Sequence, residues 1–240
     1  MWLGPSGSGS QPRTALGAYA GWMDDAAARL ETLRDSYDVG ALSEDVLAPT
    51  WLEQFEAWLG AALAAGMSEP NAMVLATAGE DGSTGARTVL LRGVDARGFR
   101  FNSNYRSRKG RELAANPRAT LLFPWYQQQR QVIVDGEVTR LAAEESDDYF
   151  AKRPRASRIA AAASPQSETI ESREEIERRF AELEAEYEGA EDPPRPEHWG
   201  GYLVAPHGVE FWQGRRDRMH DRLRFRRTTG GAWVVERLAP

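Results

Sequence analysis

The chain has 240 residues, enough to bury a hydrophobic core as one large domain or two small ones. Its formal net charge of −6 argues against a general nucleic-acid-binding protein, because such proteins are basic overall. The absence of cysteine excludes disulfides and thiolate metal sites, and no apolar run reaches the roughly 20 residues that span a bilayer. Because the sequence has no secretory signal pattern either, we expect a cytoplasmic protein without membrane or nucleic-acid partners.

The first elements expected along the chain are a flexible leader and a helix. Residues 1–14 begin with the Gly- and Ser-rich stretch M-W-L-G-P-S-G-S-G-S-Q, a composition typical of flexible linkers. Residues from about 15 to 37 carry apolar side chains at helical spacing, which predicts a helix. We find no internal repeat and interpret residues 15–240 as a single domain.

Two capping boxes predict helix starts further along the chain. Thr50 with Glu53 precedes an apolar stripe, which predicts a helix that packs against the core. Ser172 with Glu175 precedes a highly charged segment that ends near Tyr187, which we interpret as a peripheral helix with a solvated outer face. Shorter helices are expected at 111–115 and 144–152.

Apolar runs separated by turn signals predict an antiparallel sheet. Asp95–Gly98 is a turn signal, so we expect a β-hairpin in which Val89–Leu91 pairs with the alternating stretch Phe99–Asn102. Further strands are expected at 73–77, 119–125, 131–141, 201–205, 208–213, 223–227 and 232–238. This pattern favours an α+β, mainly β, barrel-type fold, and the G-x-G-x-x-G fingerprint of a Rossmann site is absent from the sequence.

Cationic side chains gather around that hairpin and the helix that follows it. Arg87 and Arg92 flank the apolar run, and Arg108 and Lys109 precede the helical run where free N–H groups would add positive character. A phosphate would offset their mutual repulsion, because guanidinium groups match its oxygens in pairs. The spacing alone equally allows a solvated basic face on a strand pair.

The order of motifs resembles that of the pyridoxamine (pyridoxine) 5′-phosphate oxidase family, whose members are FMN enzymes with the split-barrel fold. The motifs are R-x-V-L-L-R-G (87–93), D-x-x-G-F-x-F (95–101), N-Y-x-S-x-K-G (104–110), R-Q-V (130–132), Y-F-x-x-R-P-R-x-S (149–157), S-x-Q-S (164–167), W-G-G-Y (199–202), E-F-W-Q-G (210–214), R-M-H-D-R (218–222) and R-L-A-P (237–240). The resemblance covers nearly the whole chain beyond about residue 30. It implies an antiparallel split β-barrel of the FMN-binding type with peripheral helices, and a homodimer with FMN at the subunit interface.

The resemblance also implies two sets of site residues. For FMN, the phosphate is assigned to Arg87, Arg108 and Lys109, and the remaining contacts to Val89, Leu90, Asn102, Ser103, Gln131, Gln166, Ser167, Trp212 and Arg222. For the substrate, the resemblance assigns the phosphate to Arg92, Tyr149, Arg153 and Ser157. Arg218 and His220 are the implied catalytic residues, which contact the pyridine ring and the reacting carbon. Arg34 and Tyr37 are implied to belong to a mobile segment that covers the substrate.

Simpler interpretations stay open for several of these residues when each is taken alone. Taken alone, Gln131 and Gln166 fit surface amides, and Trp212 a core aromatic, better than a site role. A lone histidine such as His220 is usually structural or exposed, but within the R-x-H-D-R motif we favour a site role for it. Arg34 and Tyr37 equally fit an ordinary helix end. A metal site is not expected, because no histidine pair has metal-ligand spacing.

The implied reaction oxidises pyridoxamine 5′-phosphate or pyridoxine 5′-phosphate to pyridoxal 5′-phosphate, with O2 as acceptor, H2O2 as product and ammonia released from the amine. Four departures from the family pattern bear on efficiency and substrate choice. Arg92 stands where Lys is usual, Asn102 where an aromatic is usual, Ala160–Ala162 where G-A-W is typical, and Ile133 where a basic residue is frequent.

Two other functions remain open from the sequence. One is a split-barrel flavin oxidase of the phenazine-pathway type that acts on another substrate, although the R-P-R-x-S motif at 153–157 argues against it. The other is a non-catalytic protein that binds flavin or pyridoxal phosphate, and turnover with O2 separates it from both oxidases.

Overall fold

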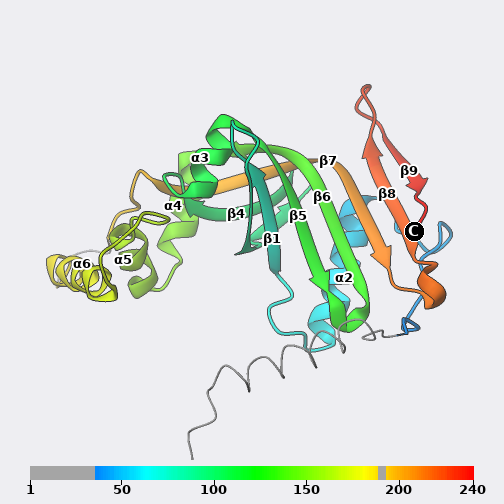
Figure 1. The fold of residues 1–240 in the computed structure, drawn as a ribbon, viewed down its shortest axis with the longest axis horizontal. Helices are drawn as coiled ribbons and strands as arrows, with labels where there is room; N and C mark the ends of the chain where they lie inside the picture. The colour runs from blue at the N-terminus through cyan, green and yellow to red at the C-terminus, as the bar shows by residue number, and fades with distance from the viewer. Residues whose placement is uncertain (1–35, 189–192) are drawn as a thin grey trace, which may run out of the picture. The chain divides into compact units, whose positions relative to one another are not determined.

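The computed structural model describes residues 36–188 and 193–240 (Figure 1). The predicted leader, Arg34 and all but the end of the helix expected at 15–37 lie outside the described residues. Residues 37–240 form one unit around a nine-stranded sheet in the described chain, with the order β2-β1-β5-β6-β7-β4-β3 and with β8 and β9 continuing from β7.

Every strand pairing in this sheet is antiparallel. The strands are β1 (Ala72–Ala78), β2 (Thr84–Leu90), β3 (Gly93–Asp95), β4 (Gly98–Asn104), β5 (Arg118–Trp125), β6 (Arg130–Arg140), β7 (Trp199–Gln213), β8 (Asp221–Arg227) and β9 (Trp233–Arg237). The helices are α2 (Trp51–Ala64), α3 (Arg108–Ala115), α4 (Ala143–Ala151), α5 (Arg155–Ala163) and α6 (Arg173–Glu186), with short 3-10 turns at Tyr126–Gln128 and Arg216–Arg218.

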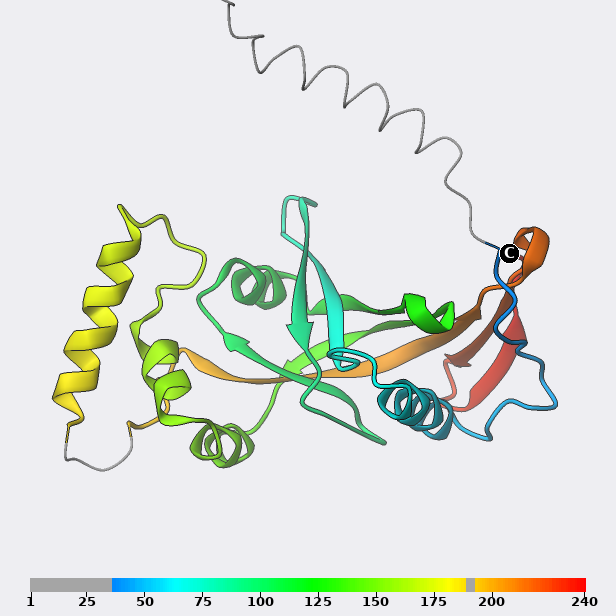
Figure 2. The same ribbon diagram turned by 90° about the horizontal axis from the view of Figure 1, so that it is seen from below.

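The core lies between α2 and the inner face of the curled sheet (Figure 2). The capping box of α2 is confirmed, because Thr50 Oγ1 accepts from Glu53 N at 3.2 Å and Glu53 Oε2 accepts from Thr50 N at 3.1 Å. Phe55, on the next turn, packs edge-on against Phe99 and Phe123 with centroid distances of 4.9 and 5.0 Å. Burying each such ring contributes about 1.5–3 kcal/mol. The predicted antiparallel split barrel with peripheral helices is confirmed.

The hairpin predicted around the basic cluster is partly wrong. The turn Asp95–Gly98 is present, but it joins β3 to β4, and Val89 pairs with Met73 of β1. The chain changes partner strand within one residue: Leu91 N donates to Asn71 O, whereas Arg92 N donates to Arg100 O, both at 2.8 Å. This switch places Arg92 where β2 ends, beside β4.

The two strands expected at 201–205 and 208–213 form a single long strand, β7. Pro206 lies opposite Gly136 and Gly208 opposite Asp135, so His207 forms a β-bulge rather than a break. A Cβ on Gly136 would lie 2.4 Å from Ala205 O, which shows why a glycine is needed at this crossing.

The capping box predicted for the charged helix is wrong, although α6 itself is present. The Ser172 side chain makes no hydrogen bond to the helix N-terminus, and Glu175 Oε2 accepts from Glu171 N at 3.0 Å instead. The helix lies against α5 at the periphery, as expected (Figure 2). Among the described residues, no helix is long and apolar enough to cross a membrane.

Candidate functional site

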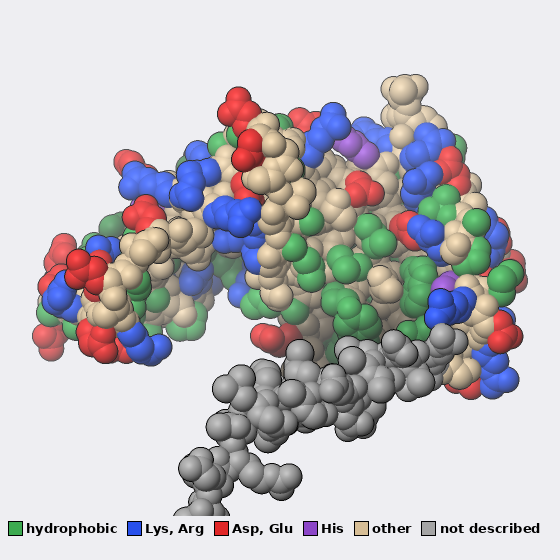
Figure 3. Space-filling view, in the orientation of Figure 1, with side chains coloured by type: hydrophobic (Ala, Val, Ile, Leu, Met, Phe, Trp, Pro, Cys, Tyr) green, Lys and Arg blue, Asp and Glu red, His purple; other side chains and the backbone are tan. Residues whose placement is uncertain are grey.

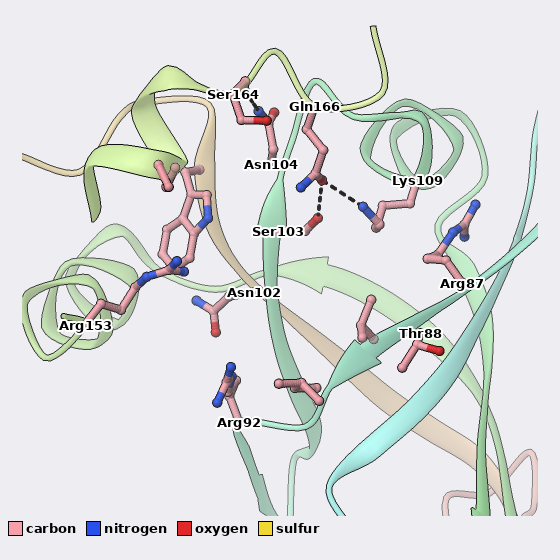
Figure 4. Close-up of a pocket in the computed structure, with 15 residues that line it drawn as sticks. Arg87, Thr88, Arg92, Asn102, Ser103, Asn104, Lys109, Arg153, Ser164 and Gln166 are labelled. Atoms are coloured by element: carbon pink, nitrogen blue, oxygen red, sulfur yellow. Dashed lines mark hydrogen bonds between the residues drawn. The ribbon is translucent and has the colours of Figure 1, made fainter. Parts of the chain in front are cut away.

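A cavity of about 490 Å³ lies between β2, β4, the start of α3, α5 and the start of β7 (Figure 4). Its lining residues are Arg87, Thr88, Val89, Leu90, Arg92, Asn102, Ser103, Asn104, Lys109, Arg153, Ala160, Ala161, Ser164, Gln166 and Trp199. Most residues predicted to hold FMN, together with Arg92 and Arg153 from the predicted substrate set, therefore share one cavity. Three of the departures from the family pattern form part of its wall: Arg92, Asn102, and Ala160 with Ala161 of the alanine run.

Two cations approach each other at one end of this cavity. Arg87 projects from β2, and Lys109 lies on the first turn of α3, which begins after the N-cap residue Ser107. Lys109 Nζ donates to Gln166 Oε1 at 2.8 Å, and Ser103 Oγ donates to the same oxygen at 3.4 Å (Figure 4). Burial, followed by repulsion from Arg87, lowers the pKa of Lys109 below its ordinary value. An anion at this end would relieve that repulsion.

Arg108, the third cation predicted for this end, lies outside the cavity lining. Its Nε donates to Glu112 Oε1 at 2.7 Å and its Nη2 to Thr84 O at 3.1 Å. Glu112, which is 7% exposed, also accepts from Arg87 Nη2 at 2.9 Å and from Thr77 Oγ1 at 2.5 Å. Glu112 was not predicted from the sequence, although its i,i+4 spacing from Arg108 is a signal that could have found it.

The other end of the cavity carries a second pair of cations, Arg92 and Arg153 (Figure 4). Arg153 Cζ lies 4.6 Å from the ring centroid of Trp199, and that ring stacks on Tyr149 with a centroid distance of 6.2 Å. Arg92 Cζ lies 5.9 Å from the Tyr149 ring. Tyr149 therefore lies outside the cavity lining and contacts two lining residues, Trp199 and Arg92. The backbone carbonyl of Ser157 accepts a hydrogen bond from Arg153 Nη2 at 3.0 Å.

Arg153 has an unused donor at this end. Within the described residues, its buried Nε has no hydrogen-bond partner. Burial also lowers the pKa of Arg153, with repulsion from Arg92 adding to the effect. Because a buried donor without a partner is destabilising, an anion that accepts from Arg153 would be favoured here. Trp199, which orients this guanidinium, had no role predicted from the sequence beyond its place in the W-G-G-Y motif.

Most of the remaining predicted residues form a second cluster around Trp212. The Tyr37 ring lies edge-on to Trp212 at 5.9 Å and to His220 at 5.7 Å, and Trp212 and His220 are 4.6 Å apart. His220 Nδ1 accepts from Arg215 N at 3.1 Å, which assigns the proton of the neutral ring to Nε2. Burial, and then repulsion from Arg218, lowers the pKa of His220 below its ordinary value.

Arg222 is fixed in the same cluster by three hydrogen bonds. Its Nε and Nη2 donate to the two carboxylate oxygens of Glu210 at 2.7 and 3.1 Å, and its Nη1 donates to Ala239 O at 3.0 Å. Gln131 pairs with Trp212 in the β6–β7 ladder. Ser167 belongs to neither group: it is exposed, has a φ of 74°, and lies outside the cavity lining.

The two groups of predicted site residues lie toward opposite ends of β7. Trp199, its first residue, lines the cavity, and Trp212 is 13 steps further along the strand. At about 3.3 Å per residue, this corresponds to roughly 40 Å of strand. A single chain therefore does not bring Trp212 and His220 to its own cavity.

Two family models match this chain. The model described as "Pyridoxamine 5'-phosphate oxidase" matches residues 59–187, and the model described as "Pyridoxine 5'-phosphate oxidase C-terminal dimerisation region" matches residues 199–240. The chain is 51% identical over 212 residues to a pyridoxine/pyridoxamine 5′-phosphate oxidase of Cupriavidus necator, covering 88% of this chain and 99% of that protein. It is 54% identical over 219 residues to one of Rubrobacter xylanophilus, covering 91% of this chain and all of that protein.

Solved structures show the same fold. PhzG from Burkholderia lata, in complex with tetrahydrophenazine-1-carboxylic acid, matches with a TM-score of 0.79 and 33% identity over 86% of this chain and all of that one. A pyridoxamine 5′-phosphate oxidase-related, FMN-binding protein from Nostoc punctiforme matches with a TM-score of 0.62 at 18% identity, over 81% of this chain and 99% of that one. By these matches, the chain belongs to the pyridoxamine 5′-phosphate oxidase family.

Proposed function

We propose that the chain is an FMN-dependent oxidase that converts pyridoxamine 5′-phosphate or pyridoxine 5′-phosphate to pyridoxal 5′-phosphate. O2 accepts two electrons and two protons and becomes H2O2. When the substrate is the amine, one water molecule hydrolyses the oxidised product, which gives the aldehyde and releases ammonia. The names of the Cupriavidus and Rubrobacter relatives, which match over nearly their whole length, support this reaction. The observation that carries the proposal is a cavity with cations at two separate ends, Arg87 with Lys109 and Arg92 with Arg153.

The lining of the cavity fits FMN by its chemistry. Arg87 and Lys109 provide charge-assisted donors for a phosphate, while Ser103 and Gln166 provide hydroxyl and amide partners for ribityl hydroxyls. Val89 and its apolar neighbour Leu90 lie between the two cationic ends, where a flat ring would pack. FMN, when bound, supplies the ring that accepts a hydride from the substrate carbon.

The second cationic end suits a substrate that carries its own phosphate. Arg92 and Arg153 line the cavity, and the unpaired Nε of Arg153 among the described residues offers a donor that a phosphate oxygen can accept from. Tyr149 and Trp199 hold these guanidiniums through ring contacts. The chain would therefore contribute mainly orientation, by fixing the substrate at its phosphate.

A homodimer would complete this site. The C-terminal family model describes a dimerisation region, and residues 199–240 include the Trp212 cluster that lies far from the cavity of its own chain. Figure 3 shows hydrophobic side chains on the face of β1, β5 and β6, where Val74, Leu122 and Ile133 are neighbours across the strands and half-buried. Covering this face with a second copy would bury apolar surface and could bring the second Trp212 cluster to the cavity, with FMN between the subunits.

The Trp212 cluster has the properties needed next to a reacting carbon. Its neutral His220 donates through Nε2, because Nδ1 is occupied by Arg215 N. Arg218 adds a fixed positive charge near this ring. We assign these two side chains to the pyridine ring and the reacting carbon, and Tyr37 to the cover over them, with Trp212 and Arg222 toward the flavin.

The phenazine-type alternative is less well supported. PhzG shares the fold but is less similar in sequence than the two oxidase relatives. Arg153, the first residue of the R-P-R-x-S motif, lines the cavity with an unsatisfied donor within the described chain, which suits a phosphorylated substrate.

The proposal is tested by identifying the cofactor and the products. We expect the purified protein to release FMN on denaturation, and to form pyridoxal 5′-phosphate and H2O2 in equal amounts from either phosphate ester in air. Only the amine should also yield ammonia. A protein that binds FMN but forms no aldehyde with O2 would be a flavin-binding protein instead, and the oxidase assignment would be wrong.

A further inference from the structure

We propose that Glu112 is a positioning residue for the flavin phosphate: its buried carboxylate fixes Arg87 in the cavity wall and sets the net charge of the surrounding cluster. This inference rests on the proposed function, because it assumes that Arg87 and Lys109 bind the phosphate of FMN. Glu112 itself does not line the cavity.

The carboxylate of Glu112 is shared by two cations from different elements. Its Oε2 accepts from Arg87 Nη2 on β2 at 2.9 Å, and its Oε1 accepts from Arg108 Nε on α3 at 2.7 Å. Thr77 Oγ1 on β1 donates to Oε2 at 2.5 Å. Glu112 therefore ties α3, which carries Lys109, to β1 and to β2, which carries Arg87.

This arrangement leaves donors of Arg87 available to a ligand. Arg87 Nη1 donates to Thr77 Oγ1 and, at 3.3 Å, to Leu75 O, while one Nη2 hydrogen is taken by Glu112. Within the described residues, Nε makes no hydrogen bond and Nη2 keeps a second hydrogen, so Arg87 retains donors for a ligand in the cavity that it lines. Guanidinium donors of this kind form charge-assisted hydrogen bonds to phosphate oxygens.

The backbone is shaped to hold the cluster. A Cβ on Gly85 would lie 2.5 Å from Arg87 Nη2, 3.2 Å from Glu112 Oε1 and 3.3 Å from Arg108 Nη2. A side chain at this position would therefore require Arg87 Nη2 to move away from its place beside Glu112. The contacts around Glu112 are thus a packed arrangement rather than a loose surface ion pair.

The charge of the cluster matches that of its proposed ligand. Arg87, Arg108 and Lys109 carry three positive charges and Glu112 one negative charge, which gives +2 (3 − 1), against about −1.5 to −2 for a phosphate monoester at neutral pH. Burial opposes ionisation of Glu112, but the hydrogen bonds from Thr77, Arg108 and Arg87 outweigh it and lower its pKa below the ordinary value. The negative charge also raises the pKa of Lys109, opposing the effect of burial.

The substitution Glu112→Gln tests whether Glu112 positions Arg87 or only reduces the positive charge of the cluster. Glutamine keeps the shape but replaces one accepting oxygen with a donor, so either Arg87 or Arg108 loses its partner. If Glu112 positions Arg87, FMN affinity should fall at least about tenfold, equivalent to one charge-assisted hydrogen bond. If Glu112 only reduces the positive charge, FMN should bind equally well or more tightly.

The experiment measures dissociation constants of FMN and riboflavin for the full-length protein after flavin removal, by quenching of flavin fluorescence. We expect Glu112→Gln to weaken FMN selectively and to leave riboflavin within about twofold, since riboflavin lacks the phosphate. The matched control is Glu177→Gln, which breaks the exposed i,i+4 pair with Arg173 on α6 and should change neither constant. Equal weakening of both flavins would show a general structural effect and overturn the proposal.

A second variant keeps the proposal testable if Glu112→Gln does not fold. Gly85→Ala retains every charge but displaces Arg87 Nη2, so it should produce the same selective loss of FMN. Unchanged FMN affinity in a folded Gly85→Ala protein would overturn the positioning role. If the unsubstituted protein did not prefer FMN over riboflavin, the proposed function itself would fail. If it prefers FMN and Glu112→Gln keeps that preference, only the positioning role of Glu112 would fail.

Discussion

At the scale of single residues, Arg153 is the side chain whose environment points most directly to a ligand. Its guanidinium lies over Trp199, donates to Ser157 O, and keeps a buried Nε without a partner within the described chain. We expect Arg153→Ala to raise KM for pyridoxamine 5′-phosphate at least about tenfold, equivalent to 1.4 kcal/mol, while FMN stays bound. Steady-state kinetics check this, with Lys152→Ala as the control that removes a neighbouring exposed charge. A silent Arg153→Ala would show that the substrate phosphate binds elsewhere.

His220 should make the protein sensitive to acid. Burial and Arg218 lower its folded-state pKa below the ordinary 6.5, so the unfolded chain binds the proton more readily. The stability linked to this residue is therefore complete above about pH 6.5 and is lost as the pH falls through the folded pKa. We expect the unfolding temperature to fall more steeply between pH 7 and 5 in the wild type than in His220→Gln. Parallel pH profiles would contradict the hydrogen bond from Arg215 N to a neutral ring.

The order of motifs along the chain predicted most of the charged and amide residues of the cavity, including Arg87, Lys109 and Gln166, because each belongs to a recognisable motif. It did not reveal Glu112 or Thr77. A carboxylate on a short polar helix usually faces solvent, and its burial depends on how α3 packs against β1, which local spacing does not encode.

At the scale of elements, strand identity was easier to predict than strand pairing. The alternation around Asp95–Gly98 correctly located a turn, but it could not tell that Val89 pairs with Met73 on β1. Two separate strands were expected at 201–205 and 208–213, whereas the sheet keeps one strand and accommodates Pro206 with a bulge opposite Gly136. Both differences depend on contacts between residues far apart in the chain.

The close approach of β6 and β7 at this bulge can be tested by substituting Gly136. A Cβ on Gly136 would meet Ala205 O at 2.4 Å, so we expect Gly136→Ala to destabilise the fold by about 1–3 kcal/mol. Gly60→Ala is the matched control, because Gly60 lies within α2 with nothing within 4 Å, and alanine there should be neutral or slightly stabilising. Denaturant unfolding compares the two. Equal stability of both variants would contradict the close approach at the bulge.

At the scale of the whole molecule, the two family segments share one sheet, because β7 of the C-terminal segment pairs with β4 and β6 of the N-terminal one. This continuity makes residues 37–240 one unit, while the start of the domain expected at residue 15 lies outside the described residues. The separation of Arg153 from His220 within that domain supports an active site completed by a second subunit.

Mixed dimers test this arrangement. Arg153→Ala and His220→Ala chains should each be strongly impaired alone, but a mixed dimer would contain one site with both side chains intact. With random pairing, half the dimers are mixed and half of their sites are intact, so co-expression should restore about a quarter of wild-type activity. Activity that stays at the level of the two separate variants would mean that both residues act within one subunit.

We propose that a flavin bound in this cavity oxidises a substrate held by its phosphate. The most direct measurement is the absorbance of the flavin-bound protein after anaerobic mixing with pyridoxamine 5′-phosphate or with unphosphorylated pyridoxamine. We expect rapid bleaching of the flavin bands by the phosphate ester, little bleaching by the free amine, and recovery of the bands when O2 is admitted. An unchanged flavin spectrum with the phosphate ester, or equally fast reduction by both compounds, would contradict the assignment.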